Sequence, residues 1–343
     1  MAYAGKSWEL MHPPATYLFS DADDRAYETD FPGFGRTFPH AYGEAGDKYL
    51  TTRLTLSPAG DELTLDFAKT LLDNEQLGKD DVPDYLAISF SSTDYVGHLF
   101  GASSLESEDN IARLDRTLVD LLAYIDNSVG LKNTLIVLSA DHGQPEVPGH
   151  LHELGIEDAH YFDTAGLDKA PAIAALKKKF GMGEELIEAY FPPYVYLNHT
   201  LIREKQLDQA KVELAVAEEL LKFDGVAAAV SGTALRTASL PDTRLMRAIL
   251  RNFNPKRSGD IYLVFEPNVF INDFDGLVVA STHGSPWQYD SFVPVMFAGA
   301  ALQPQAVSRP VTPYDIAPTL SACLGMKPPS AAVGTPLAEV LGD

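Results

Sequence analysis

Cysteine is nearly absent from this 343-residue chain, in which Cys323 is the single one. An internal disulfide is therefore excluded, and the apolar, helix-like neighbourhood of Cys323 predicts a thiol buried in the core. Long apolar runs are absent too, so the sequence predicts no membrane-spanning helix. Residues 1–8 do not show the basic-then-apolar pattern of a secretion signal. The remaining composition, 45% hydrophobic and 22% charged, is ordinary for a globular protein.

Basic residues are scarce. The chain has 26 Lys and Arg against 48 Asp and Glu, which gives a formal net charge of −22. Nucleic acid and anionic membrane surfaces are therefore not expected as partners, because their phosphates would be repelled. A small anionic ligand would need a local positive centre, and a bound metal ion would supply one.

One apolar run ends abruptly in residues that can bind a metal. Residues 135–138 predict a strand buried on both faces, and Asp141, His142 and Gly143 follow it. In an open α/β sheet, ligands bind just beyond the carboxyl ends of the strands. A carboxylate beside an imidazole offers oxygen and nitrogen donors that suit zinc.

Two further apolar runs end in the same way. Residues 85–90 predict a strand, after which Asp94 and His98 are four residues apart and would share one side of a helix. Gly97 between them would let the backbone approach a ligand closely. A third run leads to His283. Each of these residues could be explained singly by capping or loop hydrogen bonding, but their common position at three strand ends favours a shared metal site.

Together these motifs resemble the alkaline phosphatase superfamily, in particular the bacterial phosphate-monoester phosphatases related to type I phosphodiesterases and nucleotide pyrophosphatases. The resemblance rests on three stretches, residues 92–98, 139–143 and 282–284, and is supported by 63–69, 256–260 and 315–319. It implies that Asp94, His98 and His283 bind one zinc ion and that Asp141 and His142 belong to a second.

The resemblance covers only the later part of the family pattern. A first strand that ends in Asp, a helix that begins with the Thr or Ser nucleophile, and a phosphate-holding Lys-x-Arg pair have no counterpart before residue 60. No catalytic nucleophile is therefore assigned in this chain, and the second zinc has two of its expected four ligands. We expect a C-terminal fragment with little activity alone, whose parent enzyme forms a covalent phospho-enzyme.

The expected architecture is α/β: a largely parallel sheet flanked by helices, lacking its N-terminal strands. We expect a single incomplete domain over residues 1–343, with residues 144–269 as a cap inserted in it. Helices are predicted over 61–77, 106–127, 170–180, 184–190, 206–223, 244–250 and 315–324, and strands over 194–197, 226–230, 261–265 and 293–297.

The function implied by the resemblance is zinc-dependent hydrolysis of phosphate monoesters, with a small phosphate ester as partner. Phosphodiester or nucleotide pyrophosphate hydrolysis on the same scaffold is the alternative, because the metal ligands are shared. A catalytically silent metal-binding or scaffold protein is an alternative of another class. The family is usually exported, which implies the periplasm, whereas the sequence leaves the oligomeric state open.

Overall fold

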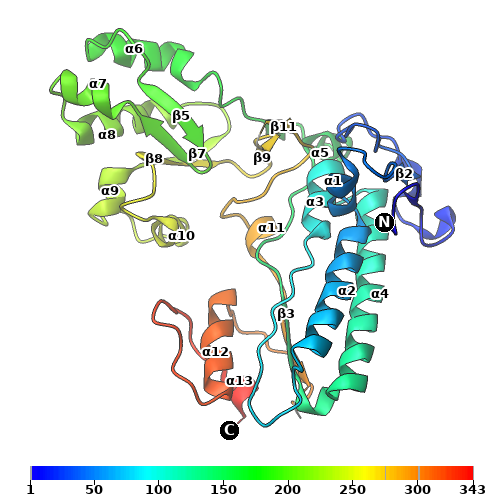
Figure 1. Ribbon diagram of the computed structural model, residues 1–343. Coiled ribbons are helices and arrows are strands. Elements are labelled where there is room, and N and C mark those ends of the chain that lie inside the picture. The colour runs from blue at the N-terminus through cyan, green and yellow to red at the C-terminus, as the bar shows by residue number, and fades with distance from the viewer. Residues whose placement is uncertain (1, 275, 300–301, 343) are drawn as a thin grey trace. The chain divides into compact units, whose positions relative to one another are not determined.

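The computed structural model describes residues 2–274, 276–299 and 302–342, and the chain forms two compact units (Figure 1). The first comprises Met1–Gln144 and Phe292–Asp343, and the second comprises Pro145–Ser291. The second unit begins one residue after the start predicted for the cap, but it continues to Ser291 and so includes His283. In the described part of the chain, none of the helices combines the length and the apolar character that a bilayer span requires.

Two long helices form the centre of the first unit, α2 (Pro58–Asn74) and α4 (Leu105–Ser128), which pack side by side (Figure 1). Helix α4 has a well-defined N-terminal cap, because the Ser104 side chain accepts a hydrogen bond from the Ser107 backbone N–H. Glu106 and Glu108 in its first turn favour the same start, since negative charge there complements the helix dipole. The short helix α3 (Ser92–Phe100) packs against both. Before them the chain is mostly irregular, with the short elements β1 (Ser7–Trp8), β2 (His40–Ala41) and α1 (Leu50–Thr55) and two single turns of 3-10 helix, Pro14–Thr16 and Ser20–Ala22.

The described strands of the first unit differ from the predicted sheet. β3 (Leu135–Ser139) is present, but it pairs antiparallel with β12 (Val295–Gly299), and residues 85–90 have no regular secondary structure. Leu138 is 40% exposed and its partner Met296 is 54% exposed, so the prediction that β3 is buried on both faces was wrong. The physical reason is that a two-stranded ribbon leaves one face without a covering layer.

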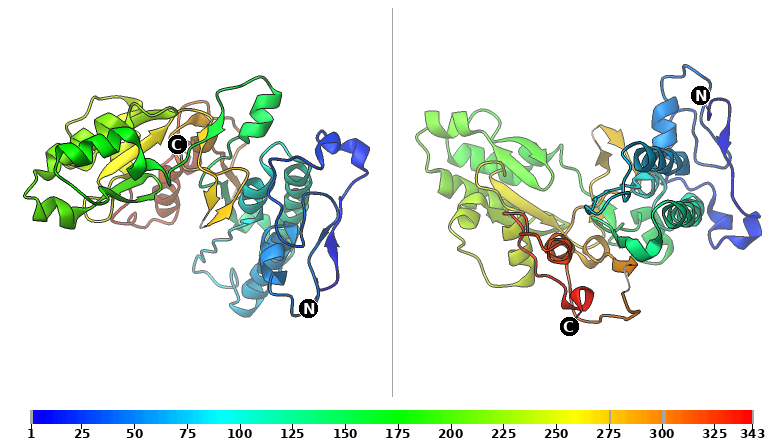
Figure 2. Two further views of the ribbon diagram at one scale, coloured as in Figure 1. Left: turned by 90° about the horizontal axis from the view of Figure 1, so that it is seen from above. Right: turned by 60° about the horizontal axis from the view of Figure 1, so that its bottom comes forward.

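The second unit contains a four-stranded antiparallel sheet in the order β5-β6-β8-β7. Its strands are β5 (Ile187–Phe191), β6 (Tyr194–Leu197), β8 (Ile261–Phe265) and β7 (Val226–Ser231). Alternate residues face two separate cores: Val195 and Leu263 lie in one, and Tyr194 and Tyr262 in the other. Helices α6 (Pro171–Lys179), α7 (His199–Glu204) and α8 (Gln209–Leu220) cover the first face, and α9 (Gly232–Arg236) and α10 (Arg244–Asn252) the second (Figures 1 and 2).

The remaining elements are short. In the second unit, β4 (His160–Tyr161) pairs in parallel with β9 (Val269–Phe270), and β10 (Asp273–Phe274) pairs antiparallel with β11 (Leu277–Val278). The same unit contains α5 (Pro148–Glu153) and α11 (Gln288–Ser291), and the first unit ends with α12 (Ile316–Cys323) and α13 (Ala338–Leu341). The α/β class predicted from the sequence is confirmed.

Two further local predictions were wrong. Within the stretch 184–190, which was predicted as a helix, residues 187–190 belong to strand β5, and Pro192 and Pro193 follow directly after this strand. A residue before proline is pushed towards extended backbone, and the two prolines make the turn into β6. Cys323 is exposed rather than buried, since it is the last residue of α12, where Pro318 and Thr319 are the buried side chains.

Candidate metal centre

Helix α3 carries Asp94 in its first turn and His98 in its last. Its start is fixed by α2, because the Ser92 backbone N–H donates to Asp61 Oδ1 at 3.1 Å. Asp61 is 2% exposed, and burial raises the pKa of its carboxyl even though this hydrogen bond opposes the shift. On the other side, Asn110 of α4 donates from Nδ2 to Thr93 Oγ1 at 3.0 Å. The first turn of α3 is therefore held by both long helices.

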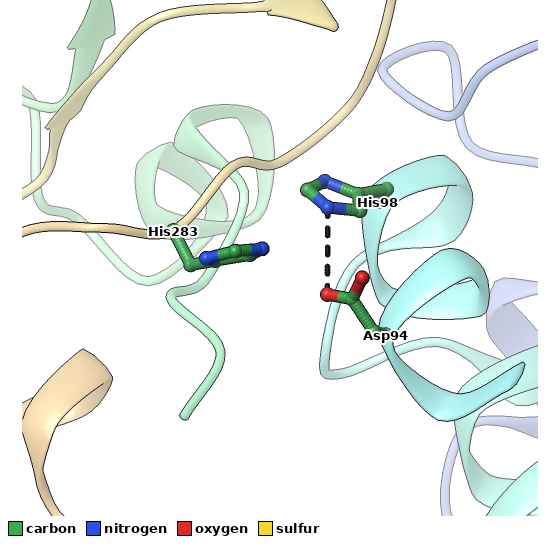
Figure 3. A group of neighbouring side chains, drawn as sticks. All are labelled: Asp94, His98 and His283. Carbon is green, nitrogen blue, oxygen red and sulfur yellow. Dashed lines mark ion pairs between the residues drawn. The ribbon is translucent and has the colours of Figure 1, made fainter. Parts of the chain in front are cut away.

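Asp94 and His98 meet as their spacing predicts. Asp94 Oδ1 lies 3.4 Å from His98 Nε2 (Figure 3). The His98 side chain is 2% exposed, whereas that of Asp94 is 31% exposed. Gly97 allows the chain to pass here, since a Cβ at this position would lie 2.8 Å from the Gln144 side chain. The close neighbour of Gly97 is thus Gln144, which follows the Asp-His-Gly stretch, and the approach of this backbone to a ligand stays a prediction.

The end of β3 brings His142 to the same carboxylate. His142 Nε2 lies 3.7 Å from Asp94 Oδ1, although 48 residues separate the two in sequence. The other ring nitrogen, Nδ1, lies 2.9 Å from the Gly143 carbonyl oxygen. A carbonyl oxygen only accepts, so Nδ1 donates to it; in the neutral imidazole Nε2 is then the nitrogen with the lone pair, and it is the nitrogen that faces Asp94. Metal-binding histidines are typically oriented in this way.

Asp141 lies at the rim of this group. Its side chain is 91% exposed, and its Oδ2 is 3.7 Å from His142 Nε2. Its Oδ1 accepts the His142 backbone N–H at 3.2 Å, which shapes the turn after β3. Within the first unit, His98 Nε2 and His142 Nε2 therefore lie 3.4 Å and 3.7 Å from Asp94 Oδ1, and the exposed Asp141 lies beside His142.

His283 follows β11 in the second unit, in a turn that a buried carboxylate fixes. Asp290 Oδ2 accepts the backbone N–H groups of Gly284, at 3.1 Å, and Ser285, at 2.7 Å. Asp290 is 4% exposed, and burial raises the pKa of its carboxyl, although the hydrogen bonds from Ser285 act in the opposite direction. Gly284 has φ +109°, a backbone conformation that favours glycine, so the turn depends on it as well.

Asp94 and His98 of the first unit and His283 of the second together offer one carboxylate oxygen and two imidazole nitrogens, a set of side chains that could hold a metal ion (Figure 3). Among the described residues this is the one group of three or more His, Cys, Asp or Glu side chains that could hold a metal ion. A carboxylate and two imidazoles are a usual donor set for catalytic zinc, which takes three protein ligands and keeps one position open. Bonds of 2.0–2.1 Å in a tetrahedron separate two ligand atoms by about 3.4 Å, which agrees with the 3.4 Å between Asp94 and His98.

Sequence reasoning missed the groups that hold these ligands in place. Asp61 and Asn110 are far from α3 in sequence, and no local pattern marks either as its partner. Asp290 is only seven residues after His283, and an acid shortly after a His-Gly-Ser turn was the one signal available.

The family profile of the type I phosphodiesterases and nucleotide pyrophosphatases matches residues 13–286. The chain belongs to this family, which is part of the alkaline phosphatase superfamily.

Individual relatives agree with this placement. The chain is 33% identical to alkaline phosphatase PafA of Elizabethkingia meningoseptica, over 98% of this chain and 60% of the relative. It is 32% identical to alkaline phosphatase PhoV of Synechococcus elongatus, over 99% of this chain and 60% of the relative. It is 37% identical to a Myroides odoratus protein named calcium-transporting ATPase, over 99% and 61%. The crystal structure of PafA superposes with a TM-score of 0.87 at 32% identity, over 98% of this chain and 63% of that one. This chain therefore spans about three fifths of the length of these relatives.

Proposed function

We propose that this chain carries the zinc-binding part of a phosphate-monoester hydrolase of the alkaline phosphatase type. The observation that carries the proposal is the position of Asp94 Oδ1, 3.4 Å from His98 Nε2 and 3.7 Å from His142 Nε2. Two elements distant in sequence thus direct nitrogen donors at one carboxylate oxygen. The relatives PafA and PhoV, both named alkaline phosphatases, support the choice of reaction.

In this proposal Asp94, His98 and His283 hold one zinc ion, and Asp141 and His142 contribute to a second. Zinc at such a site polarises phosphoryl oxygens and lowers the pKa of an attacking hydroxyl. The residues of this chain set the geometry: the His98 imidazole is fixed by burial, and His142 is fixed in one tautomer by the Gly143 carbonyl.

We further propose that the chain is part of a longer exported enzyme, in the periplasm, and turns over little substrate alone. No Thr or Ser here is assigned as the nucleophile that would become a phospho-enzyme, and the second zinc has two protein ligands in this chain against the four a closed site requires. The relatives are also longer, since the chain spans about 60% of PafA.

Metal analysis and turnover together test these proposals. We expect the purified chain, dialysed against zinc and then against buffer, to retain one equivalent and to hydrolyse p-nitrophenyl phosphate at a barely detectable rate. Two tightly retained equivalents with ordinary turnover would contradict the incomplete site, because a nucleophile would then be present. Retention of no zinc would contradict the metal centre itself.

Phosphodiester or nucleotide pyrophosphate hydrolysis remains the alternative because the matching family profile includes such enzymes. Rates on p-nitrophenyl phosphate and bis-p-nitrophenyl phosphate, measured after adding the residues that PafA has outside the aligned region, would distinguish the two. A faster reaction on the diester would overturn the monoesterase assignment. Zinc binding with no reaction on either ester would favour the silent metal-binding protein.

A further inference from the structure

The bases of this acidic chain are unevenly distributed. Five of its 26 Lys and Arg residues fall between residues 244 and 257, and no Asp or Glu occurs from 243 to 259. We call the five the basic surface: Arg244, Arg247, Arg251, Lys256 and Arg257. All five are exposed. They produce a locally positive region on a molecule of formal charge −22.

Helix α10 presents three of these residues on one side. Arg244, Arg247 and Arg251 are three and four residues apart, a spacing that places side chains on the same face of a helix. The opposite face is committed to the core, since Ile249 is fully buried against β7 and β8 and Leu245 packs beside it. The arginine face therefore cannot turn inward.

The other two members of the basic surface follow α10 in a hydrogen-bonded turn. Asn254 organises this turn: its side-chain oxygen accepts the Lys256 N–H at 3.0 Å, its carbonyl accepts the Arg257 N–H at 3.1 Å, and its own N–H donates to Ser258 Oγ at 2.9 Å. The backbone of Lys256 and Arg257 is thus held in place, although both side chains are exposed.

Most of this positive charge is not neutralised within the described residues. Arg247 pairs with Asp242, which is itself exposed. Arg244, Arg251, Lys256 and Arg257 have no carboxylate within 4.0 Å in the part of the chain that the structure describes. Four of the five are arginines, whose planar guanidinium groups bind phosphate oxygens through two hydrogen bonds at once.

We propose that the basic surface is a docking site for a compact polyanion with two or more phosphate groups, such as an oligophosphate. The stretch from Arg244 to Arg251 spans about 10 Å along the helix axis, which suits a few adjacent phosphates. A long polyanion or an anionic bilayer would extend over the surrounding acidic surface of a molecule with charge −22 and be repelled. The site does not depend on the proposed metal centre.

Calorimetric titration of the metal-free protein with inorganic tripolyphosphate tests the proposal without involving zinc. We expect saturable binding that weakens as the salt concentration is raised from about 20 to about 200 mM, because the screening length then falls about threefold. The double variant Arg251→Gln with Arg257→Gln should bind at least about 10-fold more weakly, since charge-assisted hydrogen bonds are lost.

Lys178→Gln with Lys179→Gln is the matched control, because it removes the same charge from α6 of the same unit. Its affinity should equal that of the unchanged protein, and circular dichroism should show both double variants folded. Equal weakening in the two variants, or no binding by the unchanged protein, would overturn the proposal. Tighter binding of single-stranded DNA or of anionic phospholipid vesicles than of tripolyphosphate would overturn the assignment of a compact ligand.

Discussion

The candidate centre depends at the residue scale on Asp94 Oδ1, which faces the ring nitrogens of His98 and His142. The substitution Asp94→Asn keeps the shape and removes the charge that a dication requires. We expect zinc affinity to fall about 100-fold or more, measured by competition with a chromophoric chelator. Asp66→Asn, which changes an exposed carboxylate on α2, is the control and should leave affinity unchanged. Equal affinities in the two variants would remove Asp94 from the ligand set.

Asp290 is a positioning residue rather than a proposed ligand. Its carboxylate accepts two backbone N–H groups in the turn after His283, so Asp290→Asn should loosen that turn while leaving all proposed ligands in place. We expect a fall in zinc affinity of about 10-fold, within the range known for groups that orient metal ligands. His283→Ala provides the comparison: its effect should be clearly larger. If Asp290→Asn changes unfolding but not affinity, the turn does not position His283.

At the scale of elements, the irregular segment before α1 is joined to α4 by a buried polar group. His40 Nε2 lies 3.1 Å from Glu106 Oε1, and both side chains are fully buried. Glu28 is 5% exposed, and the pKa of its carboxyl is raised to about 8. The main causes are burial and the neighbouring Glu106; Asp23 adds to the shift, and Arg36 opposes it. Burial lowers the pKa of His40 to about 4.

These shifts give the unfolding free energy a defined dependence on pH. Between pH 6.5 and 8, folded Glu28 keeps a proton that the unfolded chain has lost, so its contribution falls as pH rises through that window. His40 acts in the other direction, and only below 6.5, where the unfolded chain binds a proton that the folded state does not. Between pH 6.5 and 8, the unfolding free energy should fall less steeply with pH in Glu28→Gln than in the unchanged protein. We expect the difference in slope to be up to about 1.4 kcal/mol per pH unit, measured by urea unfolding.

Glu75→Gln is the control for this pH dependence, because Glu75 is exposed at the end of α2. It should leave the slope of the unchanged protein intact. A slope that is the same in Glu28→Gln and in the unchanged protein would show that Glu28 is ionised in the folded state.

The elements that sequence predicted well are those whose signals are local. Helix α4 has an apolar pattern and the Ser104 cap, and helix α8 has Asp208, whose side chain accepts the Ala210 and Lys211 N–H groups. The failures depend on partners distant in sequence. Residues 85–90 are apolar enough for a strand but have no strand partner among the described residues, and Leu138 is exposed because β3 pairs only with β12.

The metal centre shows the same division. The spacing of Asp94 and His98 predicted their contact because one helical turn determines it, and His142 meets them through β3. The support from Asp61 and Asn110 could not be predicted, because it comes from how α2 and α4 pack against α3. That zinc is bound by the five predicted ligands remains a prediction; these are Asp94, His98, Asp141, His142 and His283.

At the scale of the whole molecule, the two units differ in how the chain builds them. The second, Pro145–Ser291, is one continuous segment with cores on both faces of its sheet, whereas the first combines Met1–Gln144 with Phe292–Asp343. A continuous segment of about 150 residues buries enough apolar surface to fold alone. The first unit cannot be made from Met1–Gln144 by itself, because β12, the partner of β3, lies beyond residue 291.

We therefore expect a polypeptide of residues 145–291 to unfold in urea in one cooperative transition. A polypeptide of residues 1–144 should show no such transition. The full chain should show a transition at the same urea concentration as the isolated second unit. Circular dichroism follows the secondary structure of each polypeptide. Tryptophan fluorescence of the 145–291 polypeptide reports through Trp287, which packs against the core on the α10 side of the sheet, whereas in the full chain the buried Trp8 of the first unit contributes as well. Coincident loss of both units in the full chain, together with an unfolded 145–291 polypeptide, would show that the second unit needs the first. If 145–291 folds, the basic surface can be titrated on it alone, since every residue of that surface and the core behind α10 belong to this segment.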